Sequence, residues 1–292
     1  MLFYSSDSCR QFRSLIECVN LAKFHTLHLL CVCVCVCVLQ TGRATSGSVL
    51  RPIVRQVYHF FLLDMLKKAA ALGLPLAQRT MEFCTQHSRQ AACEDLEKAE
   101  QLLYDALTEA LEPVQRIAER LERDLGVPYM HIDTSLAPGL DTPSMTDSFE
   151  ALGIGPFGGP GTLAVCSLVT SVLKRIPVRK GGYCGLMLPV CEDAGLSKAA
   201  AEGHLRIADL LQYSCFCGCG LDTVPIQGYT GDPVEDRTVE QKIAGIIMDL
   251  TALAFRLDKP LSCRLLPQPG KKSGDKTTFQ SPYLINSRVM VL

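Results

Sequence analysis

Short apolar runs alternate with helical segments through the second half of the chain, and a polar turn follows each run. Strands that alternate with helices in this way form parallel βαβ units. Runs without a polar face are typical of strands that helices cover on both sides. The pattern predicts an α/β domain over residues 126–292. Strands are expected at 127–132, 186–190 and 261–266, a short apolar run within 214–225, and helices at 162–174, 205–213 and 239–257.

The polar turns after the apolar runs indicate where a functional site would lie. In parallel α/β folds, ligands bind beyond the carboxyl ends of the strands. The turns here contain Asp133-Thr134-Ser135, Cys191-Glu192-Asp193 and the segment 269–275. We therefore expect the side chains of these turns to converge on one shared pocket.

A helical region over residues 46–125 precedes this domain. Its composition and period predict a mostly buried helix over 51–72 and a second helical stretch over 75–86. The clearest signal spans 94–125, where apolar residues recur every three or four positions. Pro113 is expected to kink this segment and to start a new helix. The apolar stripe continues to the end of the segment through Ile117, Leu121 and Leu125.

The first 45 residues are set apart by a Cys-Val pair that is repeated four times over 31–38. A TGTGTG repeat in DNA is translated in this frame as Cys-Val, so we interpret residues 1–45 as a gene-model artefact outside the fold. A secretory signal or anchor is the alternative. The apolar run 29–39, of 11 residues, is shorter than the roughly 20 that span a bilayer but fits the apolar part of a signal peptide. An exposed Cys-Val alternation would also be an aggregation-prone strand.

Charge and cysteine usage narrow the class of protein. The net charge is −1 and no basic cluster is present, which argues against a nucleic-acid surface. Of 15 cysteines, nine are scattered beyond residue 40. A chain that is 48% hydrophobic can build a core without disulfides, so we expect these nine to be reduced thiols. These features predict a cytosolic protein with no membrane partner.

Four motifs follow one another along the chain: His131–Pro138, Gly182–Asp193, Cys217–Pro225 and Pro267–Asp275. Together they resemble the motifs of a known family, domain of unknown function 711, also called uncharacterised protein family 0210. The resemblance is strong over 126–290 and weaker over 50–125. It implies a ten-stranded α/β barrel similar to that of pyruvate formate-lyase. Because family members are longer at the N-terminus, we expect a partial barrel whose N-terminal strands are missing or replaced.

Carboxylates in two of these motifs are candidates for catalysis. Asp133 follows a strand and could bind a metal or act as a base; alternatively, it forms a hydrogen-bonded turn with Ser135. Glu192 and Asp193 could share a cation or hold different protonation states. The alternative for this pair is the N-terminus of a helix, where the helix dipole favours acids. A divalent metal therefore stays open as a cofactor.

Cys217 is the candidate nucleophile, and Asp222 is its companion carboxylate. A reactive thiolate requires a helix N-terminus or a nearby cation, which His131 or Lys271 could supply. The alternative is a small buried apolar side chain. The Cys-x-Cys-x-Cys spacing that ends at Cys219 lacks the gaps of a zinc site, so we expect no zinc there.

Lys271 and Lys272 lie in a glycine-containing turn that ends at Asp275 and follows the last expected strand. Free backbone N–H groups and lysine charge could hold a phosphate or carboxylate; the alternative is a solvated turn. The stretch 281–292 contains no glycine, which argues against a glycyl radical there.

Together these features predict a cytosolic enzyme that acts on a small anionic metabolite. A non-catalytic small-molecule-binding or regulatory module, or a truncated inactive copy, are the alternatives. Assembly as a homo-oligomer is left open.

Overall fold

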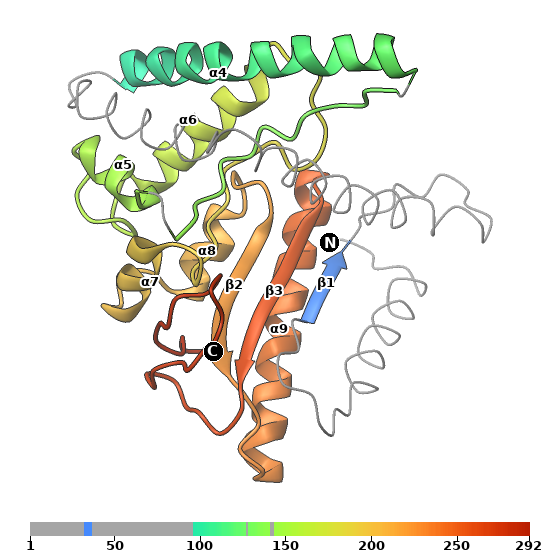
Figure 1. The fold of residues 1–292 in the computed structure, drawn as a ribbon. Coiled ribbons are helices and arrows are strands. Elements are labelled where there is room, and N and C mark those ends of the chain that lie inside the picture. The colour runs from blue at the N-terminus through green and yellow to red at the C-terminus, as the bar shows by residue number, and fades with distance from the viewer. Residues whose placement is uncertain (1–31, 37–95, 127, 141–142) are drawn as a thin grey trace, which may run out of the picture.

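The computed structural model describes residues 32–36, 96–126, 128–140 and 143–292 (Figure 1). The helices predicted at 51–72 and 75–86 lie outside these ranges. No helix within the described ranges is both long and apolar enough to cross a bilayer. The helices are α4 (Leu96–Leu125), α5 (Met145–Ala151), α6 (Thr162–Arg175), α7 (Ala194–Ala201), α8 (Ile207–Tyr213) and α9 (Pro233–Leu257). The strands are β1 (Val32–Val36), β2 (Gly220–Gln227) and β3 (Leu261–Gln268).

A three-stranded sheet of strand order β1-β3-β2 lies at the centre of the fold. Strands β2 and β3 are parallel and are joined through α9, which packs against β3, while α8 packs against β2 (Figure 1). β2 is buried along almost its whole length. The mixed helix-and-strand architecture with a small parallel sheet confirms the α/β prediction at this level.

The first two expected strands are reduced to isolated parallel bridges in the described residues. One cause is Asp133, whose carboxylate accepts the backbone N–H groups of Tyr183 at 3.2 Å and Cys184 at 3.0 Å. A regular parallel ladder would pair those N–H groups with carbonyl groups. The other is Pro189, which has no N–H to donate. The expected strands at 127–132 and 186–190 are thus replaced by the bridges Ile132–Lys180, Leu136–Leu186 and Pro189–Asp222.

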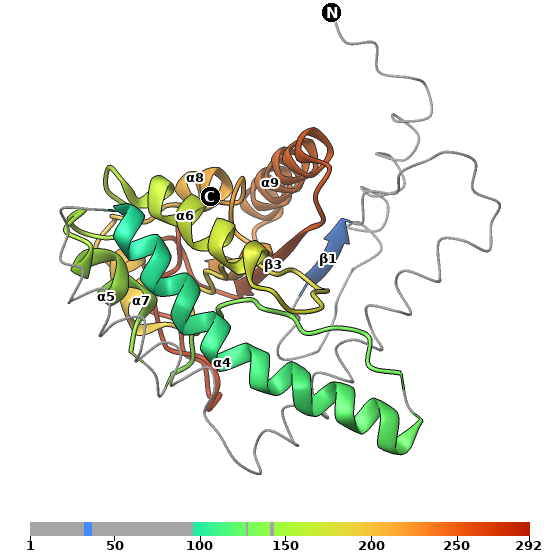
Figure 2. The same ribbon diagram turned by 90° about the horizontal axis from the view of Figure 1, so that it is seen from above.

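β1, from the Cys-Val tract, pairs with the edge of β3 that β2 leaves open (Figure 2). The pairing is antiparallel and places Val34 opposite Cys263. The sequence interpretation excluded this tract from the fold, so it did not anticipate the strand. An edge strand presents unpaired backbone groups that accept any extended segment, and a Cys-Val alternation has the side-chain period of a strand. The origin of residues 1–45 as a translated repeat stays a prediction.

α4 is a single helix that runs through Pro113, so the expectation of a new helix there was wrong. Its sequence on both sides of Pro113 is rich in Glu, Leu, Arg and Ala, which are strong helix formers. Its buried residues all lie in the first half, where α4 packs on α6. The expected apolar stripe is therefore packed only in part, and its last members, Ile117, Leu121 and Leu125, are exposed.

α9 begins at Pro233, six positions before the expected start at Val239. Asp232 caps the helix, because its carboxylate accepts the backbone N–H groups of Val234 at 2.8 Å and Glu235 at 3.0 Å. Proline suits the first helical position, since its missing N–H would have no partner there. The exposed first turns of α9 lack an apolar stripe, which is why hydrophobic period alone placed the start too late.

Candidate functional site

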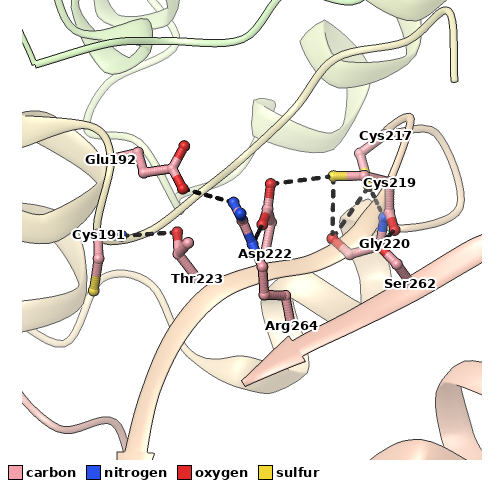
Figure 3. Close-up of polar contacts among 9 residues, drawn as sticks. All are labelled: Cys191, Glu192, Cys217, Cys219, Gly220, Asp222, Thr223, Ser262 and Arg264. Carbon is pink, nitrogen blue, oxygen red and sulfur yellow. Dashed lines mark hydrogen bonds and ion pairs between the residues drawn. The ribbon is translucent and has the colours of Figure 1, made fainter. Parts of the chain in front are cut away.

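Arg264 joins two of the candidate carboxylates (Figure 3). Its Nε donates to Oδ1 of Asp222, and its Nη2 donates to Oε1 of Glu192 at 2.6 Å. Arg264 lies in the middle of β3, and Asp222 lies near the start of β2. The parallel register places Leu221 opposite Cys263, so the two charged side chains come from neighbouring positions. Two carboxylates around one guanidinium give the group a net negative charge when all three are ionised.

Burial within this group increases from Glu192 to Asp222. The side chains of Glu192 and Arg264 are 30% and 31% exposed, whereas that of Asp222 is 11% exposed. Burial raises the pKa of Asp222 above its usual range, because the loss of hydration outweighs the attraction of Arg264. A carboxyl group with a raised pKa can both accept and donate a proton closer to neutral pH.

A β-bulge in β2 shapes the backbone at Asp222. The pairing with β3 shifts between Leu221 and Val224, and Thr223 adopts a φ of 43°. This left-handed conformation is costly for a β-branched residue and persists only where surrounding contacts hold it. The Thr223 hydroxyl accepts the backbone N–H of Cys191 at 3.2 Å, and the carbonyl of Asp222 accepts that of Val190 at 3.1 Å. The bulge therefore ties β2 to the turn that carries Glu192.

Two thiols continue the polar group beyond Asp222. The Cys219 thiol donates to Oδ2 of Asp222 with an S···O distance of 3.8 Å, and the backbone N–H of Gly220 donates to the Cys217 sulfur at 3.3 Å. The hydrogen bond from Cys219, and after it the charge of Lys259, lower the pKa of the Cys217 thiol to about 6 despite its burial. The same bond and burial raise the pKa of Cys219. Cys217 is thus the thiol that ionises first.

Lys259 is the cation beside the thiol loop. Its ammonium group donates to the carbonyl oxygens of Ser214 at 2.9 Å and Cys215 at 3.4 Å, and also to that of Cys217. Burial lowers the pKa of Lys259. Asp258, which ends α9 with a φ of 49°, turns the chain toward this loop. Sequence reasoning missed Lys259, because no local pattern marks a lysine whose position depends on the end of a distant helix.

Asp133 forms the turn that was its alternative interpretation. Its Oδ1 accepts the backbone N–H of Ser135 at 3.0 Å and the Ser135 hydroxyl at 2.6 Å. The same carboxylate also accepts the two backbone N–H groups of the 183–184 segment. Asp133 and Ser135 therefore brace one loop against another, rather than extending toward Arg264.

Asp193 caps α7, which was likewise the alternative interpretation of this position. Its carboxylate accepts the backbone N–H of Leu196 at 2.8 Å, the backbone N–H of Met145 at 2.8 Å and the Ser144 hydroxyl at 2.6 Å. Because Ser144 is itself the N-cap of α5, Asp193 connects the first turns of two helices. Of these two adjacent acids, only Glu192 contacts Arg264.

The lysine turn lies beyond the C-terminal end of β3, away from Arg264. Arg264 is four residues before the end of β3, which is roughly 13 Å along a strand, and the turn follows that end. Lys272 pairs with Glu235 at 3.1 Å, and both side chains are exposed. Asp275 accepts the backbone N–H of Lys272 at 2.7 Å and so closes the turn. The structure therefore does not bring Lys271, Lys272 and Asp275 together with Asp222, and the expectation of one shared pocket was wrong for this turn.

Glycines bring the other motif loops into backbone contact. A Cβ atom on Gly185 would lie 2.7 Å from the Cα of Gly218, so the two loops pack with no space for side chains. Gly218 donates its N–H to the carbonyl of Leu186 at 2.6 Å, and Gly185 donates to the Ser135 hydroxyl at 3.3 Å. This packing covers Cys217, which is 1% exposed.

No group of three or more His, Cys, Asp or Glu side chains is arranged to hold a metal ion within the described ranges. The side chains of Asp133 and Asp193 are engaged by N–H and O–H donors, which are the groups that a metal ion would have to displace. The use of a divalent metal stays a prediction.

Comparison with known proteins gives a consistent match. A family model described as "Uncharacterised ACR (DUF711)" matches residues 73–280. A UPF0210 protein of Pyrobaculum aerophilum is 35% identical over 70% of this chain and 46% of its own length. UPF0210 proteins of Syntrophobacter fumaroxidans (34% identical over 61% of this chain and 39% of the relative) and of a Thermoanaerobacter species (38% identical over 56% and 34%) are also similar. The chain spans less than half of the length of each of these relatives.

Proposed function

The chain belongs to the DUF711 family of uncharacterised proteins, and we propose that it is a cytosolic enzyme that acts on a small anionic metabolite at the Arg264 group. We define the Arg264 group as Glu192, Arg264, Asp222, Cys219 and Cys217. We further propose that the parallel contacts between segments 132–136, 180–189, β2 and β3 belong to a barrel of the ten-stranded type. The succession of parallel contacts from one segment to the next supports the barrel, since the strands of a closed parallel barrel pair with their neighbours in this way.

The proposal rests on a difference between the two carboxylate partners of Arg264. One of its carboxylate partners, Asp222, is buried, and the other, Glu192, is partly exposed. A substrate carboxylate or phosphate can take the place of Glu192 on Nη2, because a guanidinium binds either anion in the same planar geometry. Glu192 thus acts as a stand-in for the substrate anion. Arg264 replaces Lys271 and Lys272 as the proposed anion-binding residue.

Asp222 is the proposed general acid–base residue. Burial raises its pKa above the usual range of a carboxyl group, which favours a proton on it, and it lies directly beside the guanidinium that would hold the substrate. Its second oxygen accepts the Cys219 thiol, so a proton can pass between the carboxyl group and the thiols. Cys217 is the proposed nucleophile if the glycine-packed loops open, because only the thiolate attacks and this thiol ionises most readily.

A non-catalytic binding module is the second candidate, and the burial of Cys217 favours it. A thiol that substrate cannot reach contributes no covalent chemistry, whereas the Arg264–Glu192 pair would still exchange one anion for another.

The test is a thermal-shift screen of the full 292-residue chain against small carboxylates and phosphates. A ligand present at 100 times its Kd stabilises a folded protein by about 2.7 kcal/mol, which is a measurable rise in Tm. We expect Glu192→Gln to tighten binding, since it removes the negative charge that competes for Nη2 without changing the shape of the side chain. The double substitution Lys271→Ala/Lys272→Ala is the matched control and should leave binding unchanged.

Loss of the ligand shift in the lysine variant, with no effect of Glu192→Gln, would move the anion site to the lysine turn and reject the proposal. Once a ligand is found, Asp222→Asn separates the two candidates. Turnover that is lost while binding persists supports the enzyme. Binding without turnover in the unaltered chain supports the binding module.

A further inference from the structure

Cys217 and Cys219 lie in one bend of the chain, and both sulfurs contact the same residue. The Cys217 sulfur is 3.7 Å and the Cys219 sulfur is 4.0 Å from the carbonyl oxygen of Gly220. The N–H of Gly220 also donates to the Cys217 sulfur, so both side chains gather around this one residue (Figure 3), and the two thiols share a hydrogen bond. We propose that Cys217 and Cys219 form a reversible disulfide when the protein meets a hydroperoxide.

The surroundings supply what each sulfur needs for this reaction. Cys217 receives a backbone N–H and lies near the Lys259 ammonium, and both stabilise a thiolate. Cys219 contacts the Asp222 carboxyl, which can accept its proton. The loop is also fixed in place: the Ser262 hydroxyl and its N–H both donate to the carbonyl of Cys219, at 2.7 Å and 2.6 Å. The two thiols are therefore held close together and differ in acidity.

The hydroperoxide is the oxidant that accepts the two electrons released when the disulfide forms. The Cys217 thiolate attacks one peroxide oxygen, so an S–O bond forms as the O–O bond breaks and hydroxide leaves. Cys217 becomes a sulfenic acid while the peroxide is reduced by two electrons. The Cys219 sulfur gives its proton to Asp222 and attacks the Cys217 sulfur. The S–S bond forms, the S–O bond breaks, and the oxygen leaves as water with the proton that Asp222 returns.

Two other buried thiols, those of Cys166 and Cys191, lack this environment. Burial raises the pKa of Cys191 to about 12 and that of Cys166 still further, so both stay protonated. Cys217 and Cys219 are separated by one residue, so their disulfide would close a small ring, and strained disulfides are readily reduced. The bond would thus be a reversible modification rather than a structural cross-link.

Oxidation would also change Asp222. The thiol of Cys219 lowers the pKa of this carboxyl group, and the disulfide removes that donor. An effect on catalysis rests on the function proposed above, whereas disulfide formation itself does not.

The experiment treats the reduced full-length chain with hydrogen peroxide, which is small enough to enter a closely packed loop. The protein is then denatured, alkylated and digested with trypsin. Cleavage after Arg206 and Arg237 releases Cys215, Cys217 and Cys219 in one peptide. We expect this peptide to lose the mass of two hydrogen atoms, to escape alkylation at two sulfurs, and to recover both after treatment with dithiothreitol.

Cys215→Ser is the matched control and should leave the loss unchanged. Cys219→Ser should stop the reaction at a Cys217 sulfenic acid, which dimedone traps. If a substituted chain does not fold, fragment ions of the wild-type peptide locate the bond directly. A bond to Cys215, or full alkylation of Cys217 and Cys219 after peroxide treatment, would overturn the proposal. The mass readout needs no substrate, so it fails or succeeds independently of the proposed enzyme activity.

Discussion

Replacing Arg264 with Met tests whether the Arg264 group holds a buried charge. The substitution keeps most of the aliphatic stem but leaves the Asp222 carboxyl group without its cation. Removing one partner of a buried ion pair costs about 3–5 kcal/mol. Because the Arg264 side chain is 31% exposed, we expect the lower end of this range, about 3 kcal/mol. The bond to the partly exposed Glu192 adds about 0–1 kcal/mol.

The loss of stability should depend on pH in a defined direction. Burial raises the pKa of Asp222 in the folded protein, so the folded carboxyl group keeps its proton at pH values where the unfolded one has lost it. Its contribution to stability is present below the unfolded pKa and is lost as the pH rises through the folded pKa. Arg264 opposes this rise, so Arg264→Met raises the folded pKa further. The destabilisation should therefore be small in acid and grow toward alkaline pH.

Urea denaturation followed by circular dichroism measures both effects. Lys272→Met is the matched control, because it breaks an exposed pair with Glu235 and should cost about 0–1 kcal/mol at any pH. Adding Asp222→Asn to Arg264→Met should recover much of the lost stability at alkaline pH, since no buried charge then remains. The reasoning is refuted if Arg264→Met costs no more than Lys272→Met, or if its cost is the same in acid and in alkali.

Four other substitutions test the packing and electrostatics of the fold around these residues. Gly185→Ala should lower the free energy of unfolding by about 1–3 kcal/mol, because its Cβ would lie 2.7 Å from the facing loop. Gly245→Ala, in α9 with no atom within 4 Å of the added Cβ, should raise it by about 0.5–1 kcal/mol, and equal effects at the two glycines would contradict the packing argument. Lys259→Met should shift the ultraviolet titration of the Cys217 thiolate to a pH above the present pKa of about 6; an unchanged titration would show that the ammonium has no influence there. Asp193→Ala should lower the free energy of unfolding in urea by about 2 kcal/mol, because it removes the acceptor of buried N–H groups at the starts of two helices. A decrease of only a few tenths of this amount would contradict the role of Asp193 as a helix cap.

The helices α4, α6, α8 and most of α9, together with β3, could be predicted from hydrophobic period and length, whereas the short helices α5 and α7 were not expected. The helix expected at 162–174 is observed as Thr162–Arg175, and the strand expected at 261–266 is observed as Leu261–Gln268. The expected strand at 186–190 failed for a reason that period cannot reveal. Its residues are apolar and all but Met187 are buried, but Pro189 has no N–H to donate to a ladder. An apolar run indicates that a segment is buried, but a segment forms a strand only if its backbone groups pair with those of a neighbouring segment.

The sequence pointed to several acids and thiols of the candidate site, but not to the cations that contact them. Glu192, Cys217 and Asp222 could be proposed from the sequence because they lie in motifs beside apolar runs and carry groups that can transfer a proton or attack a substrate. Arg264 and Lys259 do not stand out, because one is a polar residue inside a strand and the other follows a helix. Their roles arise only when β3 pairs with β2 and when the end of α9 reaches the thiol loop. Such contacts depend on the tertiary fold, so no local motif encodes them.

The side chains of the Arg264 group differ in solvent exposure, and this difference determines which chemical steps can occur without movement of the backbone. A molecule that approaches from solvent meets Glu192 and Arg264 first, at 30% and 31% exposure, then Asp222 at 11%. The two thiols come last, at 1% and 2%. Anion exchange on Arg264 needs no movement of the backbone, proton transfer by Asp222 needs little, and attack by Cys217 needs the Gly185–Gly218 contact to open. Substitutions that loosen this contact should therefore affect thiol chemistry more than anion binding, which makes the thiol step the one that the fold controls most tightly.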